Sequence, residues 1–342
     1  MKMNKLNALA CLICIGWLFA SCQTDLPLPA TGGAEKIILL GELCAGDSVK
    51  VRAGQSTSLS ASVPGQKLIK DLSLSLKDGT GTVTALWGAE DFLSYTLFTL
   101  QYSSPNLVQP GTEYQLQGKH PQLAEVTATV HIPTPFTALV TGRAFSNYNG
   151  DSVLSLDLAL TDPAAANAMY VIEVVKQPVS IYGYFLFDGN EYSISDNRRL
   201  YDSLKGEQVP LSERYNTSYS GTYSRQQMYT TDLSSTNLGG TPSGRLFRRI
   251  FLSGKSFGGT THHTSILLPR NALYGDFGQY AQTVIYVKSV SADYYDFLQA
   301  YEQYDPSMGL GGNASPVKLE GNVLGGFGMV GGVYKWKLEM IY

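Results

Sequence analysis

The stretches PGTEYQL (residues 110–116) and AEVTATV (residues 124–130) decide the fold class. In both, apolar and polar residues alternate with a period of two, which is the pattern of half-buried β-strands. Such a pair is typical of the last two strands of an immunoglobulin-like or fibronectin-like β-sandwich. Upstream, short runs rich in Val, Leu, Thr and Tyr alternate with turn signals, so we predict a sandwich module over residues 36–133.

Residues 132–135 (IPTP) end this module, because proline has no N–H to donate to a strand ladder. Residues 136–342 again consist mostly of strand-like runs, which predicts a second, larger β-rich domain. One helix is predicted near the C-terminus, over residues 291–304, where large side chains recur at steps of three and four. These side chains are Tyr294, Phe297, Leu298 and Tyr301. The predicted fold class is therefore mainly all-β, a sandwich followed by a β-rich domain with one helix.

Residues 188–244 form a long polar insertion in the second domain, rich in tyrosine and serine and with little periodicity. Tyr215, Tyr219 and Tyr223 recur within it at steps of four. Long insertions of this kind are usually functional or disordered, and tyrosines offer rigid contact area together with a hydroxyl group. Two interpretations stay open: a lid that binds a ligand or partner through these tyrosines, and a mobile insertion whose aromatic side chains cover the adjacent sheet.

Composition excludes several classes of protein. Of the 342 residues, 44% are hydrophobic and 15% are charged. This balance supports a packed core rather than a disordered chain, and the many glycines and tyrosines favour turn-rich β structure over coiled coils. The formal net charge is −3, and the sequence contains no run of lysines or arginines, so we expect no nucleic-acid partner.

The first residues are typical of a bacterial lipoprotein signal. A short cationic start precedes an apolar stretch over residues 6–20, which is too short for a comfortable membrane span. Two small residues then precede Cys22. We predict that residues 1–21 are removed and that Cys22 is acylated, which anchors the chain in the lipid bilayer. An ordinary signal peptide followed by a chance cysteine is the alternative.

A tether with proline and glycine follows the predicted anchor, over residues 22–35. Its first residues, Gln23-Thr24-Asp25, resemble the polar and acidic signal that bacteroidete lipoproteins use for display on the outer face of the outer membrane. We therefore expect a lipid-anchored, cell-surface-exposed protein of the outer membrane. Removal of the signal leaves Cys22, which is acylated, and Cys44, so no intramolecular disulfide is predicted.

Motifs that carry catalysis or bind metals are missing from the sequence. It contains no H-E-x-x-H, no G-x-S-x-G and no paired-cysteine spacing. Adjacent residues such as His262 and His263 point to opposite faces of a strand, which disfavours a shared zinc site, and we predict instead that they lie in a surface turn between residues 257 and 266. Residues 326–331 match G-x-G-x-x-G, but a strand-like run follows where a dinucleotide site needs a helix. We expect no cofactor, no metal and no enzymatic activity.

Several passages together resemble one family. The first domain ends in VTATVHIP (residues 126–133), and the C-terminal part contains SVSADYYDFL (residues 289–298) and GNVLGGFGMVGG (residues 321–332). With the lipoprotein site at Cys22, these passages are similar to those of the bacteroidete outer-membrane lipoproteins classed as domain of unknown function 4249. Members of that family resemble accessory lipoproteins encoded beside TonB-dependent receptors. The resemblance implies a role in nutrient capture or in capping a transporter, and it brings no catalytic residues.

The functional hypothesis is a non-enzymatic binding or accessory subunit of a TonB-dependent nutrient transporter, with its affinity in the second domain. The ligand would be a small molecule, a glycan or a peptide. Two alternatives stay open: a surface glycan or peptide hydrolase whose site is assembled from distant residues, and a structural or adhesive surface lipoprotein. Separately, Ser48, Ser152 and Ser203 lie in Asp-Ser-apolar tripeptides that resemble bacteroidete O-glycosylation sites.

Overall fold

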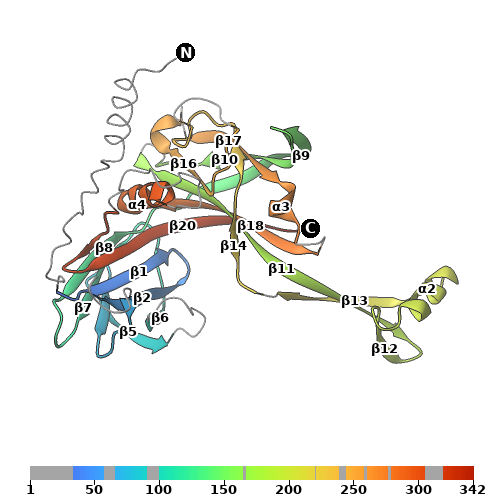
Figure 1. Cartoon of the computed structure of the whole chain (residues 1–342), viewed down its shortest axis with the longest axis horizontal. Coiled ribbons are helices and arrows are strands. Elements are labelled where there is room, and N and C mark those ends of the chain that lie inside the picture. The colour runs from blue at the N-terminus through green and yellow to red at the C-terminus, as the bar shows by residue number, and fades with distance from the viewer. Residues whose placement is uncertain are drawn as a thin grey trace, which may run out of the picture. The chain divides into compact units, whose positions relative to one another are not determined.

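The computed structural model of the chain describes residues 34–57, 66–90, 100–164, 167–219, 221–238, 244–257, 260–275, 279–304 and 319–342 (Figure 1). The predicted signal segment, Cys22 and most of the predicted tether lie outside these residues. The described residues are mostly strands, which confirms the predicted mainly β fold class.

In the described part of residues 37–131, the strands form two layers. They are β1 (Ile37–Cys44), β2 (Ser48–Ser56), β3 (Gln66–Lys67), β4 (Ser73–Lys77), β5 (Val83–Glu90), β6 (Leu100–Leu107), β7 (Glu113–Lys119) and β8 (Val126–His131). β2 pairs with β1 and β6 in one layer, and β7 pairs with β4 and β8 in the other. β5 joins the layers, because residues 83–86 pair with β4 and residues 87–90 pair with β6.

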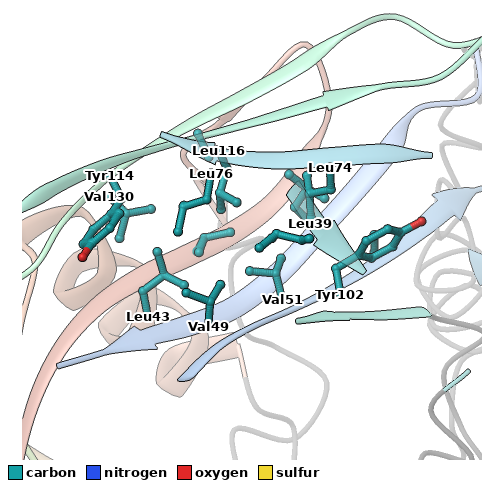
Figure 2. Packing of buried hydrophobic residues seen from close by; sticks show 14 of the residues in the cluster. Leu39, Leu43, Val49, Val51, Leu74, Leu76, Tyr102, Tyr114, Leu116 and Val130 are labelled. Carbon is teal, nitrogen blue, oxygen red and sulfur yellow. The ribbon is translucent and has the colours of Figure 1, made fainter. Parts of the chain in front are cut away.

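A hydrophobic core fills the space between these two layers. Figure 2 shows side chains of β1 and β2, such as Leu43 and Val51, pointing toward side chains of β4 and β7, such as Leu74 and Leu116. Buried and non-buried side chains alternate along β7 and along β8, as the period-two pattern predicts. β7 and β8, which carry the two stretches that decide the fold class, therefore each contribute one face to the sandwich core.

The second region contains further strands and short helices. Its strands are β9 (Thr137–Tyr148), β10 (Asp151–Thr161), β11 (Met169–Phe187), β12 (Asn190–Ser193), β13 (Ser212–Tyr219), β14 (Ser224–Gln226), β15 (Tyr229–Thr230), β16 (Arg249–Ser253), β17 (Thr261–Pro269), β18 (Ala281–Val290), β19 (Val323–Leu324) and β20 (Phe327–Ile341). Its helices are α2 (Arg198–Gly206), η2 (Gly254–Ser256), α3 (Arg270–Leu273) and α4 (Ala292–Tyr304). The helix predicted near the C-terminus is thus confirmed as α4, whereas α2, η2 and α3 were not predicted.

Two cores lie on opposite faces of the β11–β18 ladder. On one face, the sheet β15-β17-β10-β9 supplies Leu156 and Ile266 to a cluster that contains Ile172 of β11. On the other face, α4 supplies Leu298 to a cluster that contains Val171 of β11. Because successive side chains of a strand point to opposite faces, the apolar run of β11 is buried on both sides.

β20 connects the two regions of the chain. It lies between β1, with which it pairs in parallel, and β18, with which it pairs antiparallel (Figure 1). β19 pairs with β8. Val323 and Val330 belong to the first hydrophobic core, so residues near the C-terminus complete the N-terminal sandwich. Gly328 fits this close approach, because its φ is +115° and a Cβ there would overlap the Leu39 carbonyl oxygen. The division of the chain at residues 133–136 stays a prediction. Two strand ladders, β1 with β20 and β8 with β19, join the parts on either side of it.

Candidate functional site

Two of the predicted tyrosines, Tyr215 and Tyr219, lie on β13, which pairs with an extension of β11. Residues 169–178 of β11 pair with β18, whereas residues 179–187 pair with β13 and, at their end, with β12. Residues 179–219, here named the tyrosine arm, therefore form a small unit of β12, the end of β11, β13 and α2, which Figure 1 shows grouped together. The sequence of residues 188–244 has little periodicity, yet its described part contains the strands β12, β13, β14 and β15 and the helix α2.

The tyrosine arm has a small hydrophobic core of its own. Phe185 of β11 is 1% exposed, and its ring packs against Tyr192 and Tyr201 with centroid distances of 5.5 and 5.4 Å. Leu204 of α2 is also buried. These contacts explain why α2 folds over one face of the ladder, although most of its side chains are polar.

Tyr215 and Tyr219 project from the same face of β13, because they are four residues apart on a strand. Both side chains are exposed, at 57% and 49%. In the ladder with β11, Tyr215 lies opposite Gly183 and Tyr219 lies opposite Val179. The Tyr215 ring rests beside Gly183, where a Cβ would crowd it. The arm therefore presents two tyrosine rings on a paired strand rather than on a loop.

Hydrogen bonds fix the polar end of Tyr215. Its hydroxyl donates to Glu213 at 2.8 Å, and Tyr201 donates to the same carboxylate at 3.1 Å. The bond to Glu213 raises the pKa of Tyr215 to about 12, and the ion pair with Lys205 lowers the pKa of Glu213. Tyr215 is thus a neutral hydrogen-bond donor at physiological pH, and it has no character of a general base.

Tyr223, the third predicted tyrosine, lies between β13 and β14. It is 48% exposed, and its hydroxyl donates to the side-chain oxygen of Gln282 on β18 at 3.0 Å. The structure therefore places Tyr215 and Tyr219 on the arm, while Tyr223 is tied to the main sheet where the arm begins.

Sequence reasoning missed an ionic cluster on the α4 side of the sheet, formed by four buried residues (Glu173, Arg249, Lys288 and Glu302) and the exposed Glu42. Glu173 accepts from Arg249 Nε at 2.6 Å and lies 3.1 Å from Lys288 Nζ. Lys288 Nζ also donates to Glu42 at 3.0 Å, and Arg249 Nη1 donates to Glu302 at 2.8 Å. The cluster joins β1, β11, β16, β18 and α4. Its sequence signal was a single charge in each of two apolar runs, at Glu173 and Lys288, and an arginine pair that opens a third run, at Arg248 and Arg249.

Within this cluster, Glu173, Arg249 and Lys288 each favour their charged form. Burial alone would raise the pKa of Glu173, but Lys288 and Arg249 outweigh burial and hold this pKa at about 2. Burial would lower the pKa values of Lys288 and Arg249, and the facing carboxylates raise both instead. A catalytic acid or base needs a pKa near the working pH, so the cluster serves to hold the strands and α4 together.

Asp232, Ser234 and His262 have the residue types of a catalytic triad without its geometry. His262 Nε2 lies 2.7 Å from Asp232 Oδ2 and 3.2 Å from Ser234 Oγ, so both groups share one ring nitrogen. A triad instead uses opposite ring nitrogens for the carboxylate and the nucleophile. Ser234 also donates to Asp232 at 2.6 Å. The three side chains therefore fasten the segment after β15 to β17.

The surface turn predicted around the two histidines is wrong. His262 and His263 lie in β17, where they pair with Leu160 and Ala159 of β10. The ladder with β10 extends to Thr261, and this pairing overrides the polar character of the sequence. The His262 ring stacks on Phe257 at a centroid distance of 4.4 Å.

The three serines of the predicted glycosylation sites lie in regular elements. Ser48 begins β2 and is half-buried, Ser152 is exposed in β10, and Ser203 is exposed in α2. Ser203 Oγ donates to Glu207 at 3.2 Å. Glycosylation at these positions stays a prediction.

Within the described ranges, no three His, Cys, Asp or Glu side chains gather as a metal site. Cys44 is buried, and burial raises its pKa to about 11, so the thiol is not a nucleophile at neutral pH. Among the helices of these ranges, none combines the length and apolar composition that crossing a membrane requires.

No family model and no curated protein matches the chain. Among solved structures, it is similar to a DUF4785 family protein from Legionella pneumophila, with 8% identity and a TM-score of 0.22 over 74% of this chain and 52% of that chain. It is also similar to the native conformation of E. coli alpha-2-macroglobulin, with 9% identity and a TM-score of 0.22 over 79% of this chain and 14% of that chain. The chain thus spans about half the length of the first protein. Similarities at this level carry no argument about function.

Proposed function

We propose that the protein is an outer-membrane lipoprotein, anchored through acylated Cys22, that acts as a non-enzymatic binding or accessory subunit of a TonB-dependent nutrient transporter. The lipoprotein signal and the resemblance of the C-terminal passages to transporter-associated lipoproteins support this role. Asp232, Ser234 and His262 lack the geometry of a triad, and Glu173, Arg249 and Lys288 keep their charges. Binding is therefore the activity that the described side chains support best.

The tyrosine arm carries this proposal. Its ladder exposes Tyr182 and Leu186 on one face and Tyr215 and Tyr219 on the other. Large exposed side chains gathered on one element are typical of interaction sites, and tyrosines bury much area at low entropic cost. The core around Phe185 holds the ladder in shape, so little ordering is needed when a partner binds.

The test is affinity purification of the tagged protein from detergent-solubilised outer membranes, followed by mass spectrometry. We expect a TonB-dependent receptor in stoichiometric amount. Tyr215→Ala combined with Tyr219→Ala should reduce its recovery at least about tenfold, because hot-spot tyrosines each contribute about 2 kcal/mol. Tyr280→Ala removes an exposed tyrosine outside the arm and serves as the matched control. Recovery of the lipoprotein alone would overturn the proposed role, and full recovery with the double variant would move the interface away from the arm.

A further inference from the structure

A polar pocket lies beside the ionic cluster, next to β14. Its volume is about 260 Å³, and its lining consists of two arginines (Arg225 and Arg248), three amides (Gln226, Gln227 and Asn271) and two apolar side chains (Leu246 and Pro269). At ~30 Å³ per molecule, this is the space of about nine waters. The pocket thus suits one small molecule, such as a single sugar ring, rather than an oligomer.

Arg225 offers its positive charge to this pocket. Its Nη2 is 3.5 Å from Glu173, and its side chain is 38% exposed. The same carboxylate lies 2.6 Å from Arg249 and 3.1 Å from Lys288, and both of those cations are buried. Glu173 is therefore neutralised mainly from inside, and Arg225 is the most distant and most exposed of its three cations. A ligand carboxylate in the pocket could pair with the Arg225 guanidinium, which its contact with Glu173 already orients.

Further contacts fix the walls and add charge. Lys176 Nζ donates to the carbonyl oxygens of Asn271 and Tyr274 at 2.8 and 2.9 Å, which places another cation behind the Asn271 wall. The Arg248 backbone N–H donates to Glu302 at 3.3 Å. Among the described residues that line the pocket, none is acidic. The two arginines of this lining favour an anion as the ligand.

The amides distinguish between kinds of anion. A side-chain amide both donates and accepts hydrogen bonds, and sugar hydroxyls do the same, whereas phosphate oxygens accept only. The Gln226 amide nitrogen donates to the Ser224 carbonyl oxygen at 3.0 Å and to the Ser224 hydroxyl at 2.8 Å, which holds this side chain in place and leaves its oxygen to accept from a ligand hydroxyl. Leu246 and Pro269 supply an apolar surface for the C–H face of a ring. The set therefore matches a carboxylate that also carries hydroxyl groups.

We propose that this pocket binds a sugar acid, with Arg225 pairing with its carboxylate and the three amides contacting its hydroxyls. The proposal rests on the binding function proposed above and names the chemical class of the ligand. It places ligand recognition beside the ionic cluster and leaves the tyrosine arm to the partner protein.

The test is isothermal titration calorimetry of the full chain in detergent with D-glucuronate, D-glucose and inorganic phosphate. We expect glucuronate to bind at least about tenfold more tightly than glucose, which has the same ring without the carboxylate, and more tightly than phosphate. Equal affinity for glucose, tighter binding of phosphate, or no binding of glucuronate by the folded chain would overturn the proposal.

Two variants localise the site. Arg225→Lys keeps the charge beside Glu173 but removes the planar guanidinium, so we expect about tenfold weaker binding of glucuronate. Asn271→Ala removes an exposed amide of the pocket lining, so we expect severalfold weaker binding. Arg214→Lys on the tyrosine arm is the matched control and should bind normally. Circular dichroism checks folding of each variant. Unchanged affinity in both pocket variants would overturn the site. Recovery of a transporter does not depend on this pocket, so the two proposals fail separately.

Discussion

The Tyr294 hydroxyl donates a hydrogen bond of 2.6 Å to Glu42, which joins α4 to β1 across 252 positions of the chain. The phenol is buried, and burial together with Glu42 raises its pKa well above the usual value. Glu42 also accepts from Lys288, so this bond connects the helix to the ionic cluster. A helix near the C-terminus thereby holds the first strand of the N-terminal sandwich.

Tyr294→Phe tests how much the hydrogen bond between Tyr294 and Glu42 contributes to stability. The variant keeps the ring but removes the hydroxyl, so we expect a loss of about 1 kcal/mol in the free energy of unfolding, measured with urea. Tyr301→Phe, on the exposed side of the same helix, should change it by less than about 0.5 kcal/mol. A Tyr294→Phe variant as stable as the wild type would contradict the role of the bond.

Gly331→Ala should destabilise the same junction sterically. A Cβ at this position would overlap the Tyr294 ring, so the helix or β20 must shift, and we expect a loss of about 1–3 kcal/mol. Gly206 at the end of α2 has open space around it, so Gly206→Ala is the matched control and should be nearly neutral. Thermal unfolding of both variants measures the difference. Equal melting temperatures would mean that Tyr294 can move aside freely.

Glu173→Gln should be strongly destabilising at neutral pH. The variant leaves Arg249 and Lys288 buried without their shared carboxylate, and removal of one partner from a buried ion pair costs about 3–5 kcal/mol. In contrast, Lys337→Gln breaks an exposed pair with Glu339 and should cost less than about 0.5 kcal/mol. Urea titrations at pH 7 measure both. A small effect of Glu173→Gln would show that the cluster does not hold the strands together.

The free energy of unfolding should depend on pH through the carboxylate of Glu173. The pKa of Glu173 falls from 4.5 to about 2 on folding, so the unfolded chain binds more protons than the folded chain between these two pH values. The ion pairs of Glu173 in the folded protein therefore stabilise the fold fully above pH 4.5. This stabilisation is lost as the pH falls from 4.5 toward about 2. Stability measured across that window should drop less steeply in Glu173→Gln than in the wild type. Parallel curves would argue that other carboxylates dominate acid unfolding.

Phe185→Ala should unfold the tyrosine arm while the rest of the protein stays folded. The phenyl ring is the centre of the arm's small core, and its truncation costs about 3–5 kcal/mol. Hydrogen exchange should accelerate in residues 179–219 and remain unchanged in β7 and β8. Recovery of the transporter should fall as it does for the tyrosine variants. Uniformly faster exchange would instead show that the arm and the sandwich unfold together.

The sequence predicted those elements whose burial pattern is local. β7 and β8 alternate strictly, and α4 repeats large side chains at helical spacing, so each pattern was visible in a short window. By contrast, α2 buries Leu204 alone, and β13 has no buried residue, because both depend on packing against the distant Phe185 ladder. Such elements form through tertiary contacts that no short window of sequence records.

The ionic cluster and the pocket beside it were missed for a related reason. Glu42, Glu173 and Lys288 come from parts of the chain separated by more than a hundred residues, and each alone resembles an odd charge in an apolar strand. The binding role of Tyr215 and Tyr219 stays a prediction; both side chains are exposed, and their regular spacing belongs to a strand, where a step of four keeps two residues on one face.

The parallel pairing of β1 with β20 sets an order of events during biosynthesis. β1 leaves the ribosome among the first structured segments, yet the edge that β20 fills stays open until residues 327–341 have been made. In the interval, an apolar strand with unpaired backbone groups is a template for wrong pairing. This edge of β1 therefore stays exposed until the last strand has been made, and a chain truncated before residue 327 would leave the edge open and remove Val330 from the core of the N-terminal sandwich.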